Sequence, residues 1–357
     1  MKIAIVCYPT FGGSGVVATE LGLELAKRGH EIHFITYSQP VRLDSFSENI
    51  SYHEVTAAQY ALFDYVPYES ALTSKLVDVA LHEKLDILHV HYAIPHASVA
   101  YMAKQILLTN GKSIPIITTL HGTDITLVGN NRTFSPVVEF SINHSDGVTA
   151  VSESLAHDTY ENFNIHVPIK VIYNFIDFDR FKKLNKDHFR KAIAPNGEKI
   201  LIHTSNFRKV KRVDEVIRIF ASVHKVIPSK LLMIGDGPDR QSVEDMARGM
   251  NIYGDIRFLG KQEQISEILS IADLFLLPSQ TESFGLSALE AMACGLPLIC
   301  TKNSGGESIV EEGQNGFVIE AHSVEAIVEK LLLLYKQPQL IVKMRLAALE
   351  KIKSFTW

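Results

Sequence analysis

The chain has 357 residues and a mass of 39.8 kDa, and because an ordinary domain holds roughly 150 residues, about two domains are expected. Hydrophobic residues make up 46% and charged residues 21%, a composition that excludes an intrinsically disordered protein. The net charge of −5, from 35 basic and 40 acidic residues, excludes a global positive field that would hold nucleic acid or an anionic membrane.

Cysteine spacing and hydrophobic stretches both favour a cytoplasmic protein. Cys7, Cys294 and Cys300 have neither paired nor metal-type spacing, as expected of reduced thiols. The apolar start, Lys2–Cys7, is too short for the core of a signal peptide. The aliphatic block Leu331–Tyr335 is far shorter than the roughly 20 residues that span a bilayer. We expect no disulfide and no membrane segment.

Short β-branched segments alternate with amphipathic stretches, which is typical of parallel sheets covered by helices. The first series of predicted strands is Lys2–Cys7, Glu31–Thr36, Ile87–His91, Ile114–Thr119 and Gly147–Val151. The second series is Lys199–His203, Lys230–Ile234, Ile256–Leu259, Leu274–Leu277, Pro297–Thr301 and Gly316–Ile319. The charged, proline-containing stretch 162–196 separates them. We expect two doubly wound α/β domains, residues 1–167 and 168–357, that face a central cleft.

The loop after the first strand resembles a dinucleotide fingerprint. Gly13, Gly15 and Ala18 form G-x-G-x-x-A at the start of a predicted helix, Gly15–Arg28. A nicotinamide site also needs an acidic residue about 20 positions later. The second strand ends Phe34-Ile35-Thr36-Tyr37-Ser38, which contains no acidic residue. A dehydrogenase is therefore disfavoured. Two interpretations stay open: a tight turn without a ligand, and a helix start that offers backbone N–H groups to an anion.

Histidines gather around the third and fourth predicted strands, at His89, His91, His96 and His121. A metal site is one interpretation, but no cysteine or carboxylate close in sequence completes a tetrahedral set. Ordinary hydrogen-bonded histidines at strand ends are favoured. His121 differs, because it follows a strand beside a predicted helix cap, Thr123 or Asp124, where open α/β sheets bind ligands. We therefore expect a functional role for His121.

A basic cluster, Arg208–Arg212, follows the first strand of the second series. The negative net charge and the lack of interleaved aromatic residues disfavour nucleic acid. A solvated helix entrance is one interpretation. The other is a local anion site, in which Arg208 and Lys211 neutralise a diphosphate at the start of the predicted helix Asp214–Val226.

The most specific segment runs from Pro278 to Pro297. Glu282 precedes a helix predicted to begin near Phe284 or Gly285, and Glu290 lies inside that helix among small and apolar neighbours. A carboxylate in such surroundings needs a hydrogen-bonding partner. The two glutamates would suit the hydroxyl groups of a sugar and a ribose, with backbone N–H groups of the intervening turn beside them.

These segments together resemble the retaining glycosyltransferases of family 4, which use nucleotide sugars and have the twin-Rossmann GT-B fold. The resemblance covers essentially the whole chain, and its strongest motif is E-x7-E at Glu282 and Glu290. Other matching segments are Gly12–Gly15, Asn174–Asp177, Gly235–Pro238 and Gly305–Glu307. The segments Tyr8–Gly15, Leu120–Ile125 and Ser205–Arg212 are most similar to bacterial members that transfer N-acetylglucosamine from UDP-GlcNAc to L-malate at the start of bacillithiol synthesis.

The resemblance implies a donor site. Glu290 would hold the ribose of UDP, Glu282 a hydroxyl of the sugar, and Lys211 the diphosphate. Asn206, also expected to bind the donor, stands where the family usually has an arginine, so Arg208 is expected to take over the role of that arginine. The remaining donor residues are Gly13, whose amide would meet a phosphate, and Ser283, Phe284, Gly285 and Leu286, which would line the sugar or diphosphate. The expected catalytic residues are His121, near the 6-hydroxyl of the sugar, and Arg208, Lys211 and Glu282.

The acceptor would bind in the first domain. Candidates are Ser14, Tyr92, Thr119 and Arg132. Arg132 is the only arginine between Arg42 and Asn174, which makes it the candidate for binding a malate carboxylate. The alternative is that Arg132 is an exposed loop residue without a ligand. The resemblance also implies a helix beyond the Phe-Thr-Trp end that returns to the first domain. A homo-oligomer stays open.

Two mechanisms lead to retention. Double displacement needs a carboxylate nucleophile, but Asp124 is the only acid in a ligand loop of the first domain and is better explained as a helix cap. The resemblance implies attack from the leaving-group face, with the departing diphosphate as base and no metal or other cofactor. Alternatives are another acceptor, or a UDP-sugar epimerase or hydrolase on the same fold.

Overall fold

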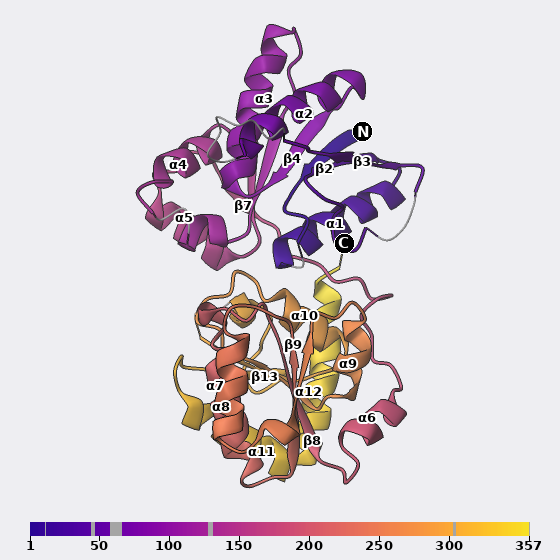
Figure 1. Ribbon diagram of the computed structural model, residues 1–357, viewed down its shortest axis with the longest axis vertical. Helices are drawn as coiled ribbons and strands as arrows, with labels where there is room; N and C mark the ends of the chain where they lie inside the picture. Colours follow the sequence, from indigo (N-terminus) through magenta and orange to yellow (C-terminus); the bar gives the residue numbers. More distant parts are fainter. Residues whose placement is uncertain (11, 44–46, 58–65, 128–130, 303–304, 357) are drawn as a thin grey trace. The chain divides into compact units, whose positions relative to one another are not determined.

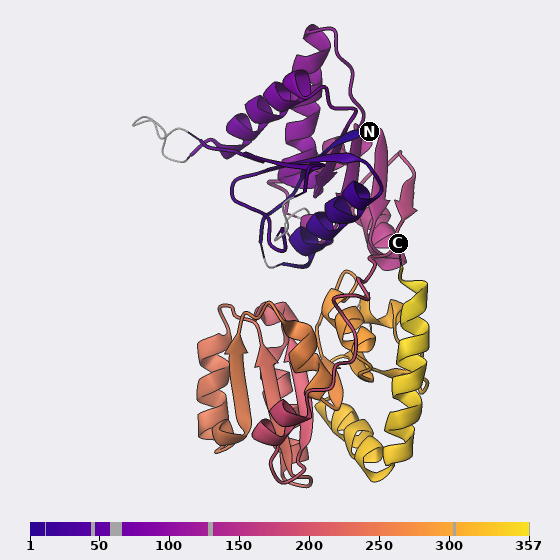
Figure 2. The same ribbon diagram turned by 90° about the vertical axis from the view of Figure 1, so that its right-hand side faces the viewer.

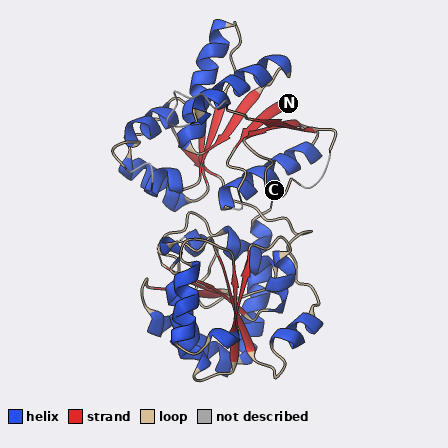
Figure 3. Ribbon diagram, in the orientation of Figure 1, coloured by secondary structure: helices blue, strands red, loops and turns tan. Residues whose placement is uncertain are grey.

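The computed structural model describes residues 1–10, 12–43, 47–57, 66–127, 131–302 and 305–356. The chain divides into two compact units, Met1–Tyr173 and Asn174–Trp357. In each unit a central parallel sheet is flanked by helices (Figures 1 and 3). The predicted α/β class with two doubly wound sheets is confirmed.

The first unit contains a seven-stranded sheet of order β3-β2-β1-β4-β5-β6-β7. Its strands are β1 (Lys2–Val6), β2 (Glu31–Thr36), β3 (Ile50–Glu54), β4 (Ile87–His91), β5 (Ile116–Leu120), β6 (Gly147–Ala150) and β7 (Ile169–Val171). The helices are α1 (Gly13–Lys27), α2 (Tyr68–His82), α3 (Ser98–Thr109), α4 (Ser135–Asn143) and α5 (Glu153–Asn162), with short helical turns at Ala93–Ala97 and Thr123–Leu127. The strand order reverses between β1 and β4, so the loops after these strands lie at the switch point where such sheets bind ligands.

Both faces of this sheet are buried, which explains why its central strands appear as continuous apolar runs. Ile3 and Ile5 of β1 belong to a core cluster with α1, whereas Ala4 and Val6 belong to a cluster with α2 and α3. Figure 2 shows the helices of this unit on both sides of its strands. Successive side chains of a strand point to opposite faces of the sheet, so each strand packs against helices on both sides. This packing positions the helices that begin at the end of the sheet where ligands bind.

The sequence did not indicate the two edge strands. β3 is half-buried and polar, with the sequence Ile-Ser-Tyr-His-Glu, and β7 has three residues within the stretch predicted as a connection. Because β7 pairs with β6, the units divide between Tyr173 and Asn174, a few residues beyond the expected boundary at 167/168. A second element in the same stretch, the short helix α6 (Asp187–Ile193), belongs to the second unit.

The second unit contains a six-stranded sheet of order β10-β9-β8-β11-β12-β13. Its strands are β8 (Lys199–Thr204), β9 (Ser229–Ile234), β10 (Ile256–Gly260), β11 (Leu274–Leu277), β12 (Leu298–Thr301) and β13 (Gly316–Ile319). Its other helices are α7 (Val213–His224), α8 (Arg240–Gly249), α9 (Ile265–Ile271), α10 (Leu286–Ala293), α11 (Val324–Lys336) and α12 (Pro338–Lys351), with 3-10 turns at Lys209–Lys211, Tyr253–Asp255, Gly305–Ser308 and Ile352–Ser354. The switch point of this sheet lies between β8 and β11.

A large apolar core joins one face of the second sheet to α7, α8 and α11. Val216 and Phe220 of α7 and Leu231 and Met233 of β9 are fully buried in it. Phe207, from the loop after β8, is buried in the same cluster. In the described ranges, every helix is too short or too polar to cross a bilayer.

Candidate functional site

The loop after β8 is held by Phe207, and this fixes the direction of its neighbours. The Phe207 carbonyl accepts a hydrogen bond from the Asp239 amide at 3.0 Å. An added Cβ would lie 1.8 Å from the Ser205 carbonyl oxygen at Gly235, and 2.5 Å from the Phe207 carbonyl oxygen at Gly237. The glycines of the Gly235–Pro238 motif thus allow the two loops to touch. Asn206 and Arg208, on either side of the buried phenyl ring, are exposed.

Lys211 and Glu282, both predicted in the donor site, form an ion pair. Lys211 Nζ lies 2.5 Å from Glu282 Oε2, and each side chain is 17% exposed. The Gln280 amide also donates a hydrogen bond to the Val210 carbonyl at 2.8 Å. These contacts bring the loops after β8 and β11 together at the switch point. The Glu282 carboxylate thus holds the Lys211 ammonium group in place at this end of the sheet.

Arg212, the last residue of the basic cluster Arg208–Arg212, contacts other residues of the second unit. It has a left-handed backbone, with φ of 49°, and immediately precedes α7. Its guanidinium lies 2.5 Å from Glu215 and also contacts His322. Its charge is therefore matched inside the second unit. Lys211 is paired as well, with Glu282, so the assignment of Arg208 and Lys211 to a diphosphate stays a prediction.

The turn before α10 is shaped by two glycines. Gly285 has φ of +88°, a conformation that favours glycine. An added Cβ on Gly305 would lie 2.4 Å from the Phe284 Cα and amide nitrogen, and the Gly305 amide donates to the Glu282 carbonyl at 2.5 Å. The buried Phe284 ring also packs edge-to-face on Phe355, with centroids 5.9 Å apart. The conformation from Glu282 to Gly285 is thus set by backbone contacts.

The helix of the E-x7-E motif begins slightly later than predicted. Its first residue is Leu286, so Glu282 and Ser283 precede it and Glu290 lies within it. Glu290 is 4% exposed, as its apolar neighbours indicate. The roles of Ser283, Leu286 and Glu290 toward a donor stay predictions.

The sequence missed His203, a buried residue beneath this site. Its two ring nitrogens lie 2.8 Å from the Leu276 carbonyl and the Ser205 hydroxyl. Burial lowers the pKa of His203 to about 4, so the imidazole is neutral near pH 7. His203 therefore joins β8, β11 and the basic loop. Its one sequence signal is a histidine near the end of an apolar strand.

In the first unit, two of the predicted acceptor residues are joined. Tyr92 Oη donates a hydrogen bond to Ser14 Oγ at 2.8 Å. Tyr92 directly follows β4 with φ of 89°, and its ring contacts those of Tyr8 and His121, with centroids 5.4 and 5.3 Å away. Burial raises the pKa of Tyr92 to about 12, so its hydroxyl keeps its proton. The loops after β1 and β4 thus share one polar surface.

His121 belongs to a buried histidine pair. His121 Nε2 lies 2.8 Å from His91 Nδ1, and the two rings stack at 5.1 Å. Burial lowers the pKa of His121 to about 3, so the ring is neutral and one nitrogen of the pair donates to the other. The predicted contact of His121 with a sugar hydroxyl stays a prediction.

Asp124 is not the helix cap that the sequence suggested. Its Oδ1 accepts hydrogen bonds from the amides of His121 and Gly122, which precede it, at 3.3 and 3.0 Å. Its Oδ2 accepts from the Ala93 amide at 2.9 Å. Asp124 is 2% exposed. Its carboxyl group therefore connects the loops after β4 and β5, a long-range contact that the local pattern did not reveal.

The other two acceptor candidates lie in different surroundings. Thr119 Oγ1 lies 2.8 Å from both His89 Nε2 and Thr149 Oγ1, so this hydroxyl joins β4, β5 and β6. Arg132 is exposed in the loop before α4 and next to residues 128–130, which lie outside the described ranges. The assignment of both residues to the acceptor stays a prediction.

Acidification is expected to destabilise the first unit. Burial lowers the pKa values of His89 and His96 to about 4 and that of His121 to about 3. The unfolded chain takes up these protons below about pH 6.5, whereas the folded unit does not, so each histidine removes about 1.4 kcal/mol of stability per pH unit. Burial raises the pKa of Asp124 to about 6, so on acidification the folded chain takes up this proton before the unfolded chain does. This gain in stability offsets the loss caused by about one of the histidines.

Urea unfolding followed by circular dichroism at pH 7, 6 and 5 measures this loss. A free energy of unfolding that stays constant over this range would contradict the prediction, because it would show that the folded chain takes up these protons as readily as the unfolded chain.

The two glycines at the start of α1 have different surroundings. Gly15 packs closely, because an added Cβ would lie 2.3 Å from the Tyr8 carbonyl oxygen and 2.7 Å from that of Thr10. Apart from its chain neighbours and the backbone of its own helix, an added Cβ on Gly13 would meet no described atom within 4 Å. Packing therefore explains Gly15, whereas the open space at Gly13 leaves room for the predicted phosphate.

Gly13→Ala is expected to keep the fold and impair donor use. Alanine keeps the backbone N–H, but its methyl group would fill the space beside it and push the phosphate away. Loss of that charge-assisted hydrogen bond costs about 1.5–3 kcal/mol, or roughly 10- to 100-fold in kcat/KM. Gly15→Ala should instead lower the melting temperature, because its methyl group meets backbone atoms that cannot move separately. Thermal melts and donor kinetics of both variants distinguish them. Equal melting temperatures for the two variants would contradict the packing argument.

Two family models match the chain. The model described as Glycosyltransferase Family 4 matches residues 11–180, and the model described as Glycosyl transferases group 1 matches residues 185–351. Over 341 residues the chain is 47% identical to N-acetyl-alpha-D-glucosaminyl L-malate synthase of Bacillus anthracis, an alignment that covers 95% of this chain and 89% of that protein. It is 24% identical to D-inositol 3-phosphate glycosyltransferase of Rhodococcus erythropolis, over 97% and 84% of the two chains.

Solved structures have the same fold. HepE of Anabaena in complex with UDP-glucose superposes with a TM-score of 0.85 at 19% identity, covering 100% of this chain and 96% of that one. Sucrose-phosphate synthase from Thermosynechococcus elongatus has a TM-score of 0.84 at 17% identity, with coverages of 100% and 95%. At these identities the likeness concerns the fold.

Proposed function

The chain belongs to glycosyltransferase family 4, and we propose that it transfers N-acetylglucosamine from UDP-GlcNAc to the hydroxyl group of L-malate, with retention at the anomeric carbon. The product would be the glucosaminyl malate precursor of bacillithiol. The observation that carries this proposal is the likeness to the Bacillus anthracis synthase along almost the whole chain. The same likeness favours malate over the other acceptors that the sequence left open.

The second unit supplies groups that suit a nucleotide sugar. Lys211, held by Glu282, and the exposed Arg208 follow β8, where positive charge would meet a diphosphate. The rigid turn from Glu282 to Gly285 and the buried Glu290 follow β11, on the other side of the switch point. This supports binding of UDP-GlcNAc in the second unit.

The contacts of Asp124 favour attack from the leaving-group face. Double displacement needs a carboxylate that is free to attack the anomeric carbon. The Asp124 oxygens instead accept three backbone hydrogen bonds inside the first unit. We therefore propose that the acceptor hydroxyl attacks while the departing diphosphate takes its proton, and that Arg208 and Lys211 stabilise the charge that develops on UDP. In this scheme the transfer step uses side-chain cations and no metal.

Product analysis tests the proposal directly. UDP-GlcNAc is incubated with the enzyme and a panel of hydroxy acids and sugars, and products are identified by mass spectrometry and anomeric NMR coupling. An α-linked malate glycoside formed with one UDP per product is expected. A glycoside of a different acceptor would replace malate but keep the family. UDP release without an acceptor, or an isomerised sugar nucleotide, would favour a hydrolase or an epimerase instead.

Arg132→Ala is expected to raise the KM for malate about 10-fold or more, because a charge-assisted hydrogen bond is worth about 1.5–3 kcal/mol. The KM for UDP-GlcNAc should change little. Arg218→Ala, which removes an exposed arginine from α7, is the control and should leave both KM values unchanged. If Arg132→Ala raised both KM values equally, the assignment of Arg132 to the acceptor would be wrong.

A further inference from the structure

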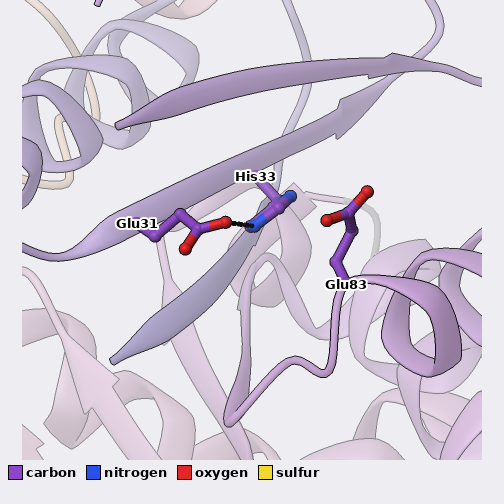
Figure 4. A group of neighbouring side chains, drawn as sticks. All are labelled: Glu31, His33 and Glu83. Atoms are coloured by element: carbon purple, nitrogen blue, oxygen red, sulfur yellow. Dashed lines mark ion pairs between the residues drawn. The ribbon is translucent and has the colours of Figure 1, made fainter. Parts of the chain in front are cut away.

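A group of potential metal ligands lies at the amino end of the first sheet. Glu31 and His33 alternate along β2 and therefore share one face of the strand. Glu83 follows the last turn of α2. One ligand atom from each of the three residues lies within 4.8 Å of the others. Figure 4 shows the Glu31 and Glu83 carboxylates on either side of the His33 imidazole. These residues sit at the strand starts, whereas the predicted substrate loops follow the strand ends.

His33 is oriented as a metal-binding histidine would be. Its Nδ1 lies 3.0 Å from His53 Nε2, and the two rings stack with centroids 5.2 Å apart. Histidine ligands commonly donate their other ring N–H to a neighbouring acceptor, which fixes the tautomer. If His33 Nδ1 donates to His53, the lone pair of Nε2 is left for a metal ion.

The Nε2 atom of His33 is buried and poorly satisfied. It lies 3.3 Å from Glu31 Oε1, yet it has no hydrogen-bond partner of adequate geometry in the described part of the chain. The side chain is 1% exposed. A buried polar atom without a partner is costly, and a cation would supply the missing interaction.

We propose that Glu31, His33 and Glu83 bind one divalent transition-metal ion, with zinc as the best match. Zinc accepts one imidazole and two carboxylates, with water in a fourth position. The ion would tie β2 to the end of α2 and thereby stabilise the first unit. This proposal is independent of the transfer reaction and of the identity of the acceptor.

Lys2 competes with the metal. Its ammonium group lies 2.9 Å from Glu31 Oε1, the oxygen that also faces His33. The Lys2 side chain is 37% exposed and can turn into solvent. Removing this charge should therefore strengthen metal binding, whereas a purely structural Lys2–Glu31 ion pair predicts no such gain.

Zinc titration of the full chain tests the site. The protein is stripped with a chelator, and binding of zinc chloride is followed by isothermal titration calorimetry, bound-metal analysis and thermal unfolding. One zinc per chain and a raised melting temperature are expected. Glu83→Gln should weaken binding at least 10-fold, and Lys2→Gln should strengthen it. His53→Phe keeps an aromatic ring beside His33 but removes the acceptor, so a loss of about 10- to 100-fold is expected.

His157→Gln is the matched control. His157 is an exposed histidine 3.8 Å from Glu161, so it offers the same ligand types on the surface. Its replacement should change neither the stoichiometry nor the affinity. Binding that persists in a folded Glu83→Gln variant with unchanged affinity would overturn the proposal, as would a wild-type chain that binds no zinc.

Discussion

Replacing Lys211 with methionine is expected to lower kcat/KM for the sugar donor by about 100- to 1,000-fold, the usual cost of removing one group that stabilises developing charge. Methionine keeps an apolar stem of similar size but removes the ammonium group that lies 2.5 Å from Glu282. The diphosphate would then gain negative charge in the transition state without this neutralising cation. The loss should appear mainly in kcat, because the charge develops as the bond breaks.

Two further variants separate this electrostatic role from a structural one. Lys209→Met removes an exposed cation of the same loop and should retain nearly full activity. The double variant Lys211→Met, Glu282→Gln removes the carboxylate left without its partner. Because Glu282 is itself predicted to hold a hydroxyl group of the sugar, the comparison uses UDP, which has no sugar to transfer. If Lys211 served only to neutralise Glu282, the double variant would bind UDP as tightly as the wild type, a result that would contradict the proposed role. Steady-state kinetics and UDP binding provide the measurements.

Gly235→Ala is expected to reduce the free energy of unfolding by about 3 kcal/mol or more, at the upper end for single substitutions. The new Cβ would lie 1.8 Å from the Ser205 carbonyl oxygen. Gly235 also has φ of +116°, which is unfavourable for alanine. Because the clash involves the backbone, the loop that carries Arg208 must move, so donor affinity should fall as well.

Gly249→Ala is the matched control for this prediction. Gly249 ends α8 in the same unit, and an added Cβ there would meet no described atom within 4 Å beyond its own helix and its chain neighbours. Alanine should leave stability unchanged or raise it by up to about 1 kcal/mol, since it favours helix more than glycine does. Urea unfolding midpoints of the two variants give the comparison. Similar midpoints would show that the loops can separate without cost.

Local patterns accounted for the central strands and for the helix of the E-x7-E motif, since burial on both faces leaves a clear apolar run. They failed where that signal was weak. β3 is polar and half-buried at a sheet edge, and β7 has three residues. Asp124 also followed a familiar cap pattern, yet its carboxyl group contacts residues that precede it and the loop after β4. A cap predicted from neighbours alone cannot account for such a contact.

The sequence by itself determined two α/β units and the residues that follow their strands, because strand periodicity and glycine turns depend on neighbours in the chain. Only the tertiary structure decided which of those residues meet. It joined Lys211 to Glu282, 71 positions apart, and directed Arg212 toward Glu215 and His322 instead. It also placed Glu83 beside Glu31 and His33. Such pairings depend on strand order and register, which bring together loops that no local spacing relates.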